Sequence, residues 1–321
     1  MRKTEKFDFY DPTMLKSYNL DDKIRYQLKM LDGMDAFTRR HSENVANITL
    51  RLCDKLHLDR GFKIYCTTCA YIHDIGKLFI PPSILQKPTK LTDEEFEIMK
   101  THTTIGAQMC IKDLKMRPFY AGPLYHHEAL NGTGYPQGLV KDQIPYEGQI
   151  LRVADEFEAI TAKRQYKSHV GIIETLNILI ENSNPPPTKT LGDVAKKTLN
   201  KEARLGKIDK TILKALFKVV IDDTEYEIAS RADYIEFLKT EIKRVNDANK
   251  YFNRMIQCKP GSETYEYYKA GAQMYLHSYE DPEKIDKMLA EFKETKKMRE
   301  AYIEKLYMEE KQIKKLLKAG I

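Results

Sequence analysis

Apolar residues recur at every third or fourth position along most of this chain, which is the spacing of one face of an α-helix. The first clear face begins near residue 41 and consists of Val45, Ile48, Leu52 and Leu56. His41 lies four residues before Val45, so it falls at the N-terminal end of the same inward face. The periodicity predicts an all-α fold.

Residues 62–79 predict a second buried helix, and its inward positions include His73 and Asp74. Gly76 is expected to end this helix, because the Pro81-Pro82 pair that follows cannot continue it. Burying an ionised carboxylate is costly unless a cation compensates its charge. A His-Asp pair on the core side of a helix therefore favours a metal site.

Thr92 and Glu95 form a capping box, which predicts that a helix starts at residues 91–92. Its expected inward face consists of Phe96, Met99, His102, Gly106 and Met109. His102 is thus an ionisable residue on an otherwise apolar stripe.

A short helix over residues 118–128 is expected to end at the adjacent pair His126 and His127. A tight loop follows over residues 131–136, where two glycines and a proline set the backbone angles. The helix expected from Ile150 then places two acids, Asp155 and Glu158, one turn apart on one face. Further helices are expected over residues 172–180 and 208–220.

The last third of the chain has a different pattern. Heptad a and d positions are taken by Ile228, Ile235, Leu238, Ile242, Val245, Phe252 and Ile256, with Asn249 at an a position. Second and third helices are expected over residues 263–279 and from residue 281. We expect an N-terminal segment (1–34), a body (35–222) and a helical C-terminal extension (223–321). The extension is either a dimerisation or partner-binding module or an antiparallel hairpin that covers the body.

Composition narrows the class of protein. The chain has 321 residues, 42% hydrophobic and 31% charged, which is typical of a soluble globular protein. A net charge of +6 is compatible with a small anionic ligand and does not indicate a nucleic-acid polymer as partner. No signal peptide or run of ~18 apolar residues is visible, and five cysteines form no even disulfide framework. These features predict a cytoplasmic protein with no membrane association.

Five of the eight histidines and two aspartates lie on the inward faces or ends of five separate predicted helices. Together they form the candidate ligand set His41, His73, Asp74, His102, His126, His127 and Asp155. Seven ligands suit two ions that share the carboxylate of Asp74. Two ions ~3.5–4 Å apart hold a hydroxide and clamp a phosphate for in-line displacement. Nitrogen and oxygen donors without a thiolate favour iron or manganese over structural zinc.

These motifs resemble the HD-GYP family, the branch of HD-domain metal phosphohydrolases that linearises cyclic di-GMP. The matching elements, which span roughly residues 35–220, are His73-Asp74-Ile75-Gly76-Lys77, His102 with Gly106, His126-His127-Glu128, Gly132-x-Gly134-Tyr135-Pro136, Asp155 with Glu158, and Arg164-x-Tyr166-Lys167.

The resemblance implies a role for each matched position. One ion would be held by His41, His73, Asp74 and Asp155, and the other by Asp74, His102, His126 and His127. Lys77 would lie beside the scissile phosphate and act with Asp74 in catalysis. Tyr135 and Pro136 would shape the guanine-side wall, and Arg164 and Lys167 would contact the ligand. The implied reaction is metal-dependent hydrolysis of cyclic di-GMP to linear pGpG, with GMP as final product left open.

Three positions depart from the family pattern. Phe37 stands where some members have a glutamate for a third ion, so a two-metal site is expected. Asn131 and Glu158 each stand where members usually have aspartate. Two alternatives stay open: a weakly catalytic or non-catalytic cyclic-dinucleotide sensor that signals through residues 223–321, or a phosphohydrolase for another nucleotide such as cyclic GMP-AMP.

Overall fold

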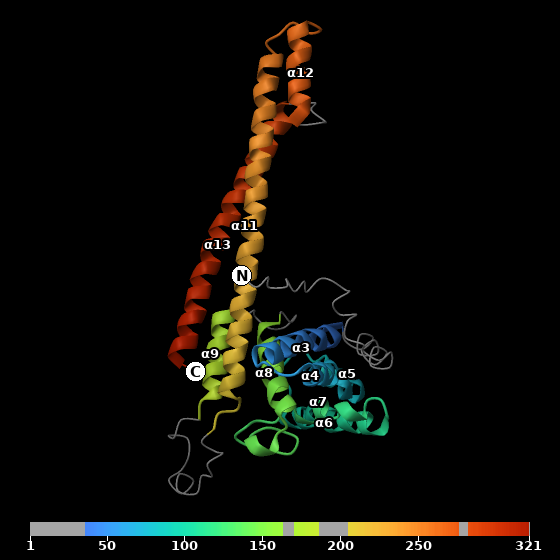
Figure 1. Ribbon diagram of the computed structural model, residues 1–321. Helices are drawn as coiled ribbons and strands as arrows, with labels where there is room; N and C mark the ends of the chain where they lie inside the picture. Colours follow the sequence, from blue (N-terminus) through green and yellow to red (C-terminus); the bar gives the residue numbers. More distant parts are fainter. Residues whose placement is uncertain (1–35, 163–169, 186–204, 276–281, 321) are drawn as a thin grey trace. The chain divides into compact units, whose positions relative to one another are not determined.

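The structure is a computed structural model that describes residues 36–162, 170–185, 205–275 and 282–320. Apart from one isolated bridge between Asn131 and Val140, every regular element in these ranges is helical (Figure 1). The predicted all-α class is therefore confirmed. The expected N-terminal segment and the proline-rich stretch over residues 186–204 lie outside the described residues. In the part of the chain that is described, no helix is both long enough and apolar enough to span a membrane.

The chain divides into two units. One unit runs to Val219 and includes the residues from Leu316 onwards, and the other covers Val220–Lys315. The division falls inside two helices, α11 (Lys210–Met255) and α13 (Pro282–Gly320). The helix predicted over residues 208–220 is therefore not a separate element, because no glycine or proline interrupts the chain between it and the heptad region. The domain boundaries drawn from the sequence stay a prediction.

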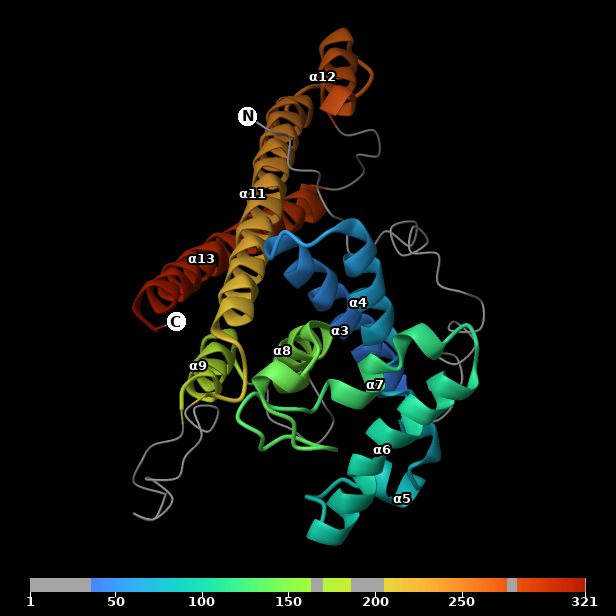
Figure 2. The same cartoon turned by 60° about the horizontal axis from the view of Figure 1, so that its bottom comes forward.

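The first unit is built on helices that pack around one core. Its larger helices are α3 (Ala36–Lys55), α4 (Arg60–Ile72), α6 (Asp93–Lys112), α8 (Tyr146–Thr161) and α9 (Ile172–Ser183). Its short elements are η1 (Ile75–Phe79), α5 (Pro82–Leu85), η2 (Arg117–Phe119), α7 (Ala121–Tyr125) and η3 (Lys141–Gln143). Helix α3 packs on α4 and α8, and α6 packs on η1 and α7. Figures 1 and 2 show α3 beside α4 and α8, and α6 beside α7.

Helix α4 ends earlier than the sequence indicates. Asp59 caps its N-terminus by accepting a hydrogen bond from the backbone N–H of Phe62, and the α-helix stops at Ile72. His73 and Asp74 occupy the turn that leads into η1, so the prediction of one helix over 62–79 is wrong. Gly76 does not terminate α4. It lies inside η1, where a Cβ would overlap the backbone carbonyl of His102 on α6.

Helix α6 begins as the capping box predicts. Thr92 accepts from the backbone N–H of Glu95, and the Glu95 carboxylate accepts from the backbone N–H of Thr92. His102 and Gly106 are buried as expected. The prediction that Phe96 faces inward is wrong, because its side chain is 44% exposed. It lies in the first turn of the helix, whose other side chains are exposed or half-buried.

Within the second unit, α11 pairs with α13 (Pro282–Gly320), and α12 (Glu263–Tyr275) lies between them in sequence. Val245 packs against Ile285 and Leu289, whereas Glu225 pairs with Lys314 at 2.9 Å. The later part of α11 thus contacts the beginning of α13, and the earlier part of α11 contacts its end. The two helices are therefore antiparallel.

Reciprocal stacking contacts join the same two helices. The Arg231 guanidinium lies 4.2 Å from the Tyr302 ring centre, and that of Arg299 lies 4.2 Å from the Tyr234 ring centre. Most of the heptad positions are buried in this hairpin, Ile242 and Asn249 are half-buried, and Ile256 is 58% exposed beyond the paired region. The hairpin accounts for the heptad pattern within one chain, and the expected dimer or partner role of residues 223–321 stays a prediction.

Candidate metal centre

The first unit gathers the seven side chains that the sequence analysis selected as metal ligands. They come from α3 (His41), the turn after α4 (His73, Asp74), α6 (His102), the end of α7 (His126, His127) and α8 (Asp155). All are buried except His127, which is half-buried. The close packing of η1 against α6, which Gly76 permits, brings the His-Asp turn beside His102.

One group consists of His41, His73 and Asp155. The Nε2 atoms of His41 and His73 are 3.3 Å apart. Asp155 Oδ1 lies 3.0 Å from the first and 3.8 Å from the second. Two imidazole nitrogens and a carboxylate oxygen therefore face one point.

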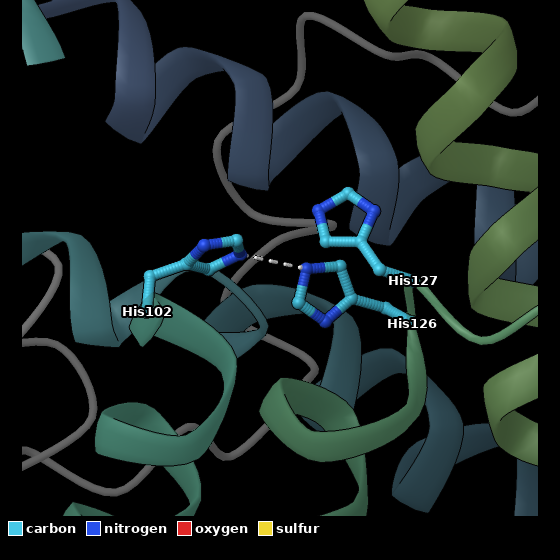
Figure 3. A group of neighbouring side chains, drawn as sticks. All are labelled: His102, His126 and His127. Atoms are coloured by element: carbon cyan, nitrogen blue, oxygen red, sulfur yellow. Dashed lines mark hydrogen bonds between the residues drawn. The ribbon is translucent and has the colours of Figure 1, made fainter. Parts of the chain in front are cut away.

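A second group consists of His102, His126 and His127. Figure 3 shows His102 reaching in from one helix, while His126 and His127 come from the end of another, with the three rings turned towards one another. The Nε2 atoms of His102 and His126 are 3.2 Å apart. His127 Nδ1 lies 3.8 Å from Asp155 Oδ2, so the carboxylate of Asp155 faces both groups.

Asp74 lies between the two groups and turns one oxygen to each. Its Oδ2 is 3.6 Å from His41 Nε2 and 3.3 Å from His73 Nε2. Its Oδ1 is 3.5 Å from His102 Nε2 and 3.9 Å from His126 Nε2. Among the described residues, Oδ1 has no hydrogen-bond partner although it is fully buried. An ionised oxygen in this position needs a cation to compensate its desolvation.

Backbone carbonyls determine which ring nitrogen carries the proton. Nδ1 of His73 lies 2.6 Å from the carbonyl of Ala70, and Nδ1 of His102 lies 2.7 Å from that of Met99. Nδ1 of His126 lies 2.9 Å from the carbonyl of Pro123. A carbonyl oxygen only accepts, so these Nδ1 atoms donate and each Nε2 keeps a lone pair.

Lone pairs on His102 and His126 thus face each other at 3.2 Å with no proton between them. Such an arrangement is repulsive unless a cation lies within reach of both. Together with the unpartnered oxygen of Asp74, it shows that the donor set fits metal ions.

The pKa values of these side chains also favour metal binding. Burial lowers the pKa of His102 to about 4, and it also holds the pKa values of His126 and His127 well below their usual range. Burial alone would raise the pKa of Asp74, but the Lys77 ammonium and then His73 outweigh it and hold the pKa well below its usual range. The imidazoles of the second group are therefore neutral and the carboxylate is ionised, as metal ligands must be.

Glu158 contacts a candidate metal ligand, and the sequence analysis did not predict this contact. Its Oε2 lies 2.5 Å from His41 Nδ1, and its Oε1 accepts from Asn44 Nδ2 at 2.8 Å. Burial lowers the pKa of His41, but hydrogen bonds to Asp155 and Glu158 outweigh it and raise the pKa to about 9. The spacing of three between Asp155 and Glu158 was the available signal, because it places both acids on one face of α8.

Lys77 and the loop over residues 131–136, which contains two glycines, lie beside the candidate metal ligands. Lys77 Nζ lies 2.5 Å from Asp74 Oδ2. The Tyr135 ring stacks on His127 with centres 4.6 Å apart.

Glu128 is buried and accepts from the backbone N–H groups of Gln137 at 2.7 Å and Leu139 at 2.8 Å, which anchors the loop that carries Tyr135 and Pro136. This anchoring role of Glu128 was also missed, although an acid directly after two candidate ligands was a signal.

The sequence analysis also singled out Asn131, Arg164, Lys167 and Phe37. The side chain of Asn131 accepts from the backbone N–H of Thr133 at 3.2 Å and from its hydroxyl at 2.7 Å, so it shapes the loop. Arg164 and Lys167 lie outside the described residues, as does the side chain of Phe37.

Comparisons with known proteins give a consistent set of matches. The family model described as "HD domain" matches residues 25–185. A cyclic di-GMP phosphodiesterase of Thermotoga maritima is 42% identical over 138 residues, covering 42% of this chain and 37% of the relative. A 3'3'-cGAMP-specific phosphodiesterase of Vibrio cholerae is 33% identical over 172 residues, covering 54% of this chain and 37% of the relative. The chain thus spans little more than a third of the length of these curated relatives.

Among solved structures, an HDG"Y"P protein from Bdellovibrio bacteriovorus matches with a TM-score of 0.42 and 20% identity, covering 56% of this chain and 51% of that one. The HD domain of the phosphodiesterase PgpH from L. monocytogenes, in complex with cyclic-di-AMP, matches with a TM-score of 0.40 and 21% identity. The match covers 60% of this chain and 94% of that one.

Proposed function

The chain belongs to the HD-domain family and carries the motifs of its HD-GYP branch, and from that membership we propose that it is a metal-dependent phosphodiesterase that hydrolyses cyclic di-GMP to linear pGpG. The observation that carries the proposal is the position of Asp74, which turns one oxygen to each of two imidazole groups. A single buried carboxylate between two sets of imidazole lone pairs suits a pair of cations.

The proposed ligands divide into two sets that share Asp74. His41, His73, Asp74 and Asp155 would hold one ion, and Asp74, His102, His126 and His127 would hold the other. When bound, the two divalent cations supply Lewis acidity towards the phosphate and activate the attacking water. Imidazole and carboxylate donors without a thiolate favour iron or manganese.

The remaining residues position the substrate. Lys77 places a half-buried positive charge beside Asp74, where it stabilises the negative charge that develops on the phosphoryl oxygens during displacement. Tyr135 stacks on His127 and so presents a flat apolar wall next to the metal ligands. In the proposed complex, the phosphate lies against Lys77 and one base lies against Tyr135 and Pro136, with Arg164 and Lys167 as further contacts.

A second candidate substrate is 3'3'-cyclic GMP-AMP. It is favoured by the relative of that specificity, which covers a larger share of this chain than the cyclic di-GMP enzyme does. The two ligands share the phosphodiester and one guanine, so the same centre accommodates either. The sensor alternative is disfavoured because recognition of a ligand alone does not require two complete sets of metal donors.

The test is a direct assay on protein purified without oxygen. Metal content is measured, and products from cyclic di-GMP and 3'3'-cyclic GMP-AMP are separated by chromatography. We expect two metals per chain and a linear product, with the Asp74→Asn variant losing both metals and turnover. Tight binding without turnover at full metal content would establish the sensor, and an active Asp74→Asn variant would refute the shared-carboxylate assignment.

A further inference from the structure

An exposed aromatic side chain lies beside the metal centre. Phe96, in the first turn of α6, is 44% exposed, and its ring centre lies 6.1 Å from that of Tyr135 in an edge-to-face arrangement. Tyr135 in turn stacks on His127. The three rings therefore form an unbroken series that runs from a proposed metal ligand to the surface.

Lys100 joins the same series from the next turn of α6. Its Nζ lies 5.4 Å from the ring centre of Phe96 and 5.8 Å from that of Tyr135. Its counterion, Glu97 at 2.5 Å, has a side chain that is 69% exposed. An ion pair with so exposed a partner is weak, so the ammonium is available to another acceptor.

We propose that Phe96 and Lys100 form a guanine subsite of this phosphodiesterase: Phe96 is a stacking platform for one base of the cyclic dinucleotide, and Lys100 donates to its O6 and N7. The inference rests on the proposed function and extends it to the choice of base. Aromatic side chains stack on any nucleobase, so Phe96 contributes affinity and little discrimination.

Discrimination comes from Lys100, whose ammonium is a donor only. Guanine presents two acceptors, O6 and N7, along one edge, whereas adenine presents an amino donor in the place of O6. A lysine at this edge therefore favours guanine and disfavours adenine. Substrates with at least one guanine are expected to be preferred, and cyclic di-AMP is expected to be rejected.

The neighbouring residue Ile98 provides a matched control. It is 42% exposed on the same helix, nearly the same as Phe96. Two residues along an α-helix correspond to a rotation of about 200°, so Ile98 points away from the series of rings. Loss of either side chain removes a similar exposed apolar group, and only Phe96 contacts Tyr135.

The experiment uses the full chain loaded with manganese and compares three diesters: cyclic di-GMP, cyclic di-AMP and the base-free bis(p-nitrophenyl) phosphate. Stacking on one aromatic ring corresponds to about a 5- to 150-fold change in binding. For Phe96→Ala we expect kcat/KM for cyclic di-GMP to fall by that factor relative to the base-free diester, mostly through KM. Phe96→Trp should restore it, and Ile98→Ala should match the unmodified protein.

For Lys100→Met we expect the ratio of kcat/KM between cyclic di-GMP and cyclic di-AMP to fall about tenfold, while Lys112→Met on the same helix leaves the ratio unchanged. If the protein cleaves cyclic di-GMP and Phe96→Ala behaves like Ile98→Ala, the subsite is overturned and the phosphodiesterase stands. If only the base-free diester is cleaved, the proposed function fails. Without turnover, dissociation constants for the two dinucleotides give the same comparisons, and absence of binding refutes both proposals.

Discussion

Replacing Glu158 with glutamine tests whether its contact with His41 positions a metal ligand. Glu158 accepts from Asn44 Nδ2 through one oxygen and contacts His41 Nδ1 through the other. When His41 Nε2 ligates a metal, its Nδ1 carries the proton, so the carboxylate faces two donors. Glutamine has the same shape but one acceptor oxygen, so in either orientation of its amide one donor faces another donor.

The expected magnitude follows from the burial of this contact. A buried donor left without an acceptor costs about 1–3 kcal/mol. Loss of the outer partner of a ligating histidine lowers metal affinity about 10- to 100-fold, which corresponds to about 1.4–2.7 kcal/mol. The two ranges agree. We expect the ion held by His41, His73 and Asp155 to be lost first, while the ion at the second group of histidines is retained.

The measurement is a chelator titration that follows metal content per chain. Glu156→Gln is the control, because Glu156 lies two residues earlier on α8 and contacts Arg152 at 3.2 Å instead of His41. Adding Asn44→Asp to Glu158→Gln supplies a new acceptor for the glutamine amide, so the double variant should regain part of the lost affinity. A Glu158→Gln protein that holds both metals as tightly as the unmodified protein would show that Glu158 does not position His41.

Two further variants probe the surroundings of the centre. Lys77→Met should lower kcat by about 10²-fold with both metals retained, since it removes one charge-stabilising donor; a Lys87→Met control should leave kcat unchanged, and loss of metal in Lys77→Met would point to a role in assembling the site instead. Gly76→Ala should lower the melting temperature and reduce metal binding, because the new Cβ meets the backbone of α6 and overpacking costs about 1–3 kcal/mol. Gly171→Ala, where nothing lies within 4 Å of the added atom, should be nearly neutral, and equal melting temperatures for the two alanine variants would contradict this account.

Helical class and the convergence of the histidines could be predicted because both depend on local periodicity. The apolar face of α3 fixes the direction of His41, and the capping box fixes the start of α6. Once each polar residue is placed on an inward face, a helical body has one centre for them to share.

The predictions that failed depend on contacts between elements. The end of α4 at Ile72 reflects the packing of η1 against α6, which periodicity along one segment does not contain. Phe96 fits the helical pattern of α6, yet its side chain is 44% exposed in the described part of the chain. The Glu158–His41 pair joins residues 117 positions apart, so only the assembled fold reveals it.

The two Arg–Tyr stacks of the C-terminal hairpin have a consequence for its folding. On α11 the arginine precedes the tyrosine by three residues, and on α13 it does the same, so the antiparallel helices present matching pairs in reverse order. Sliding one helix by a single turn would separate both stacks at once. The alignment is therefore specified twice, and loss of either arginine leaves the other contact to select the same pairing.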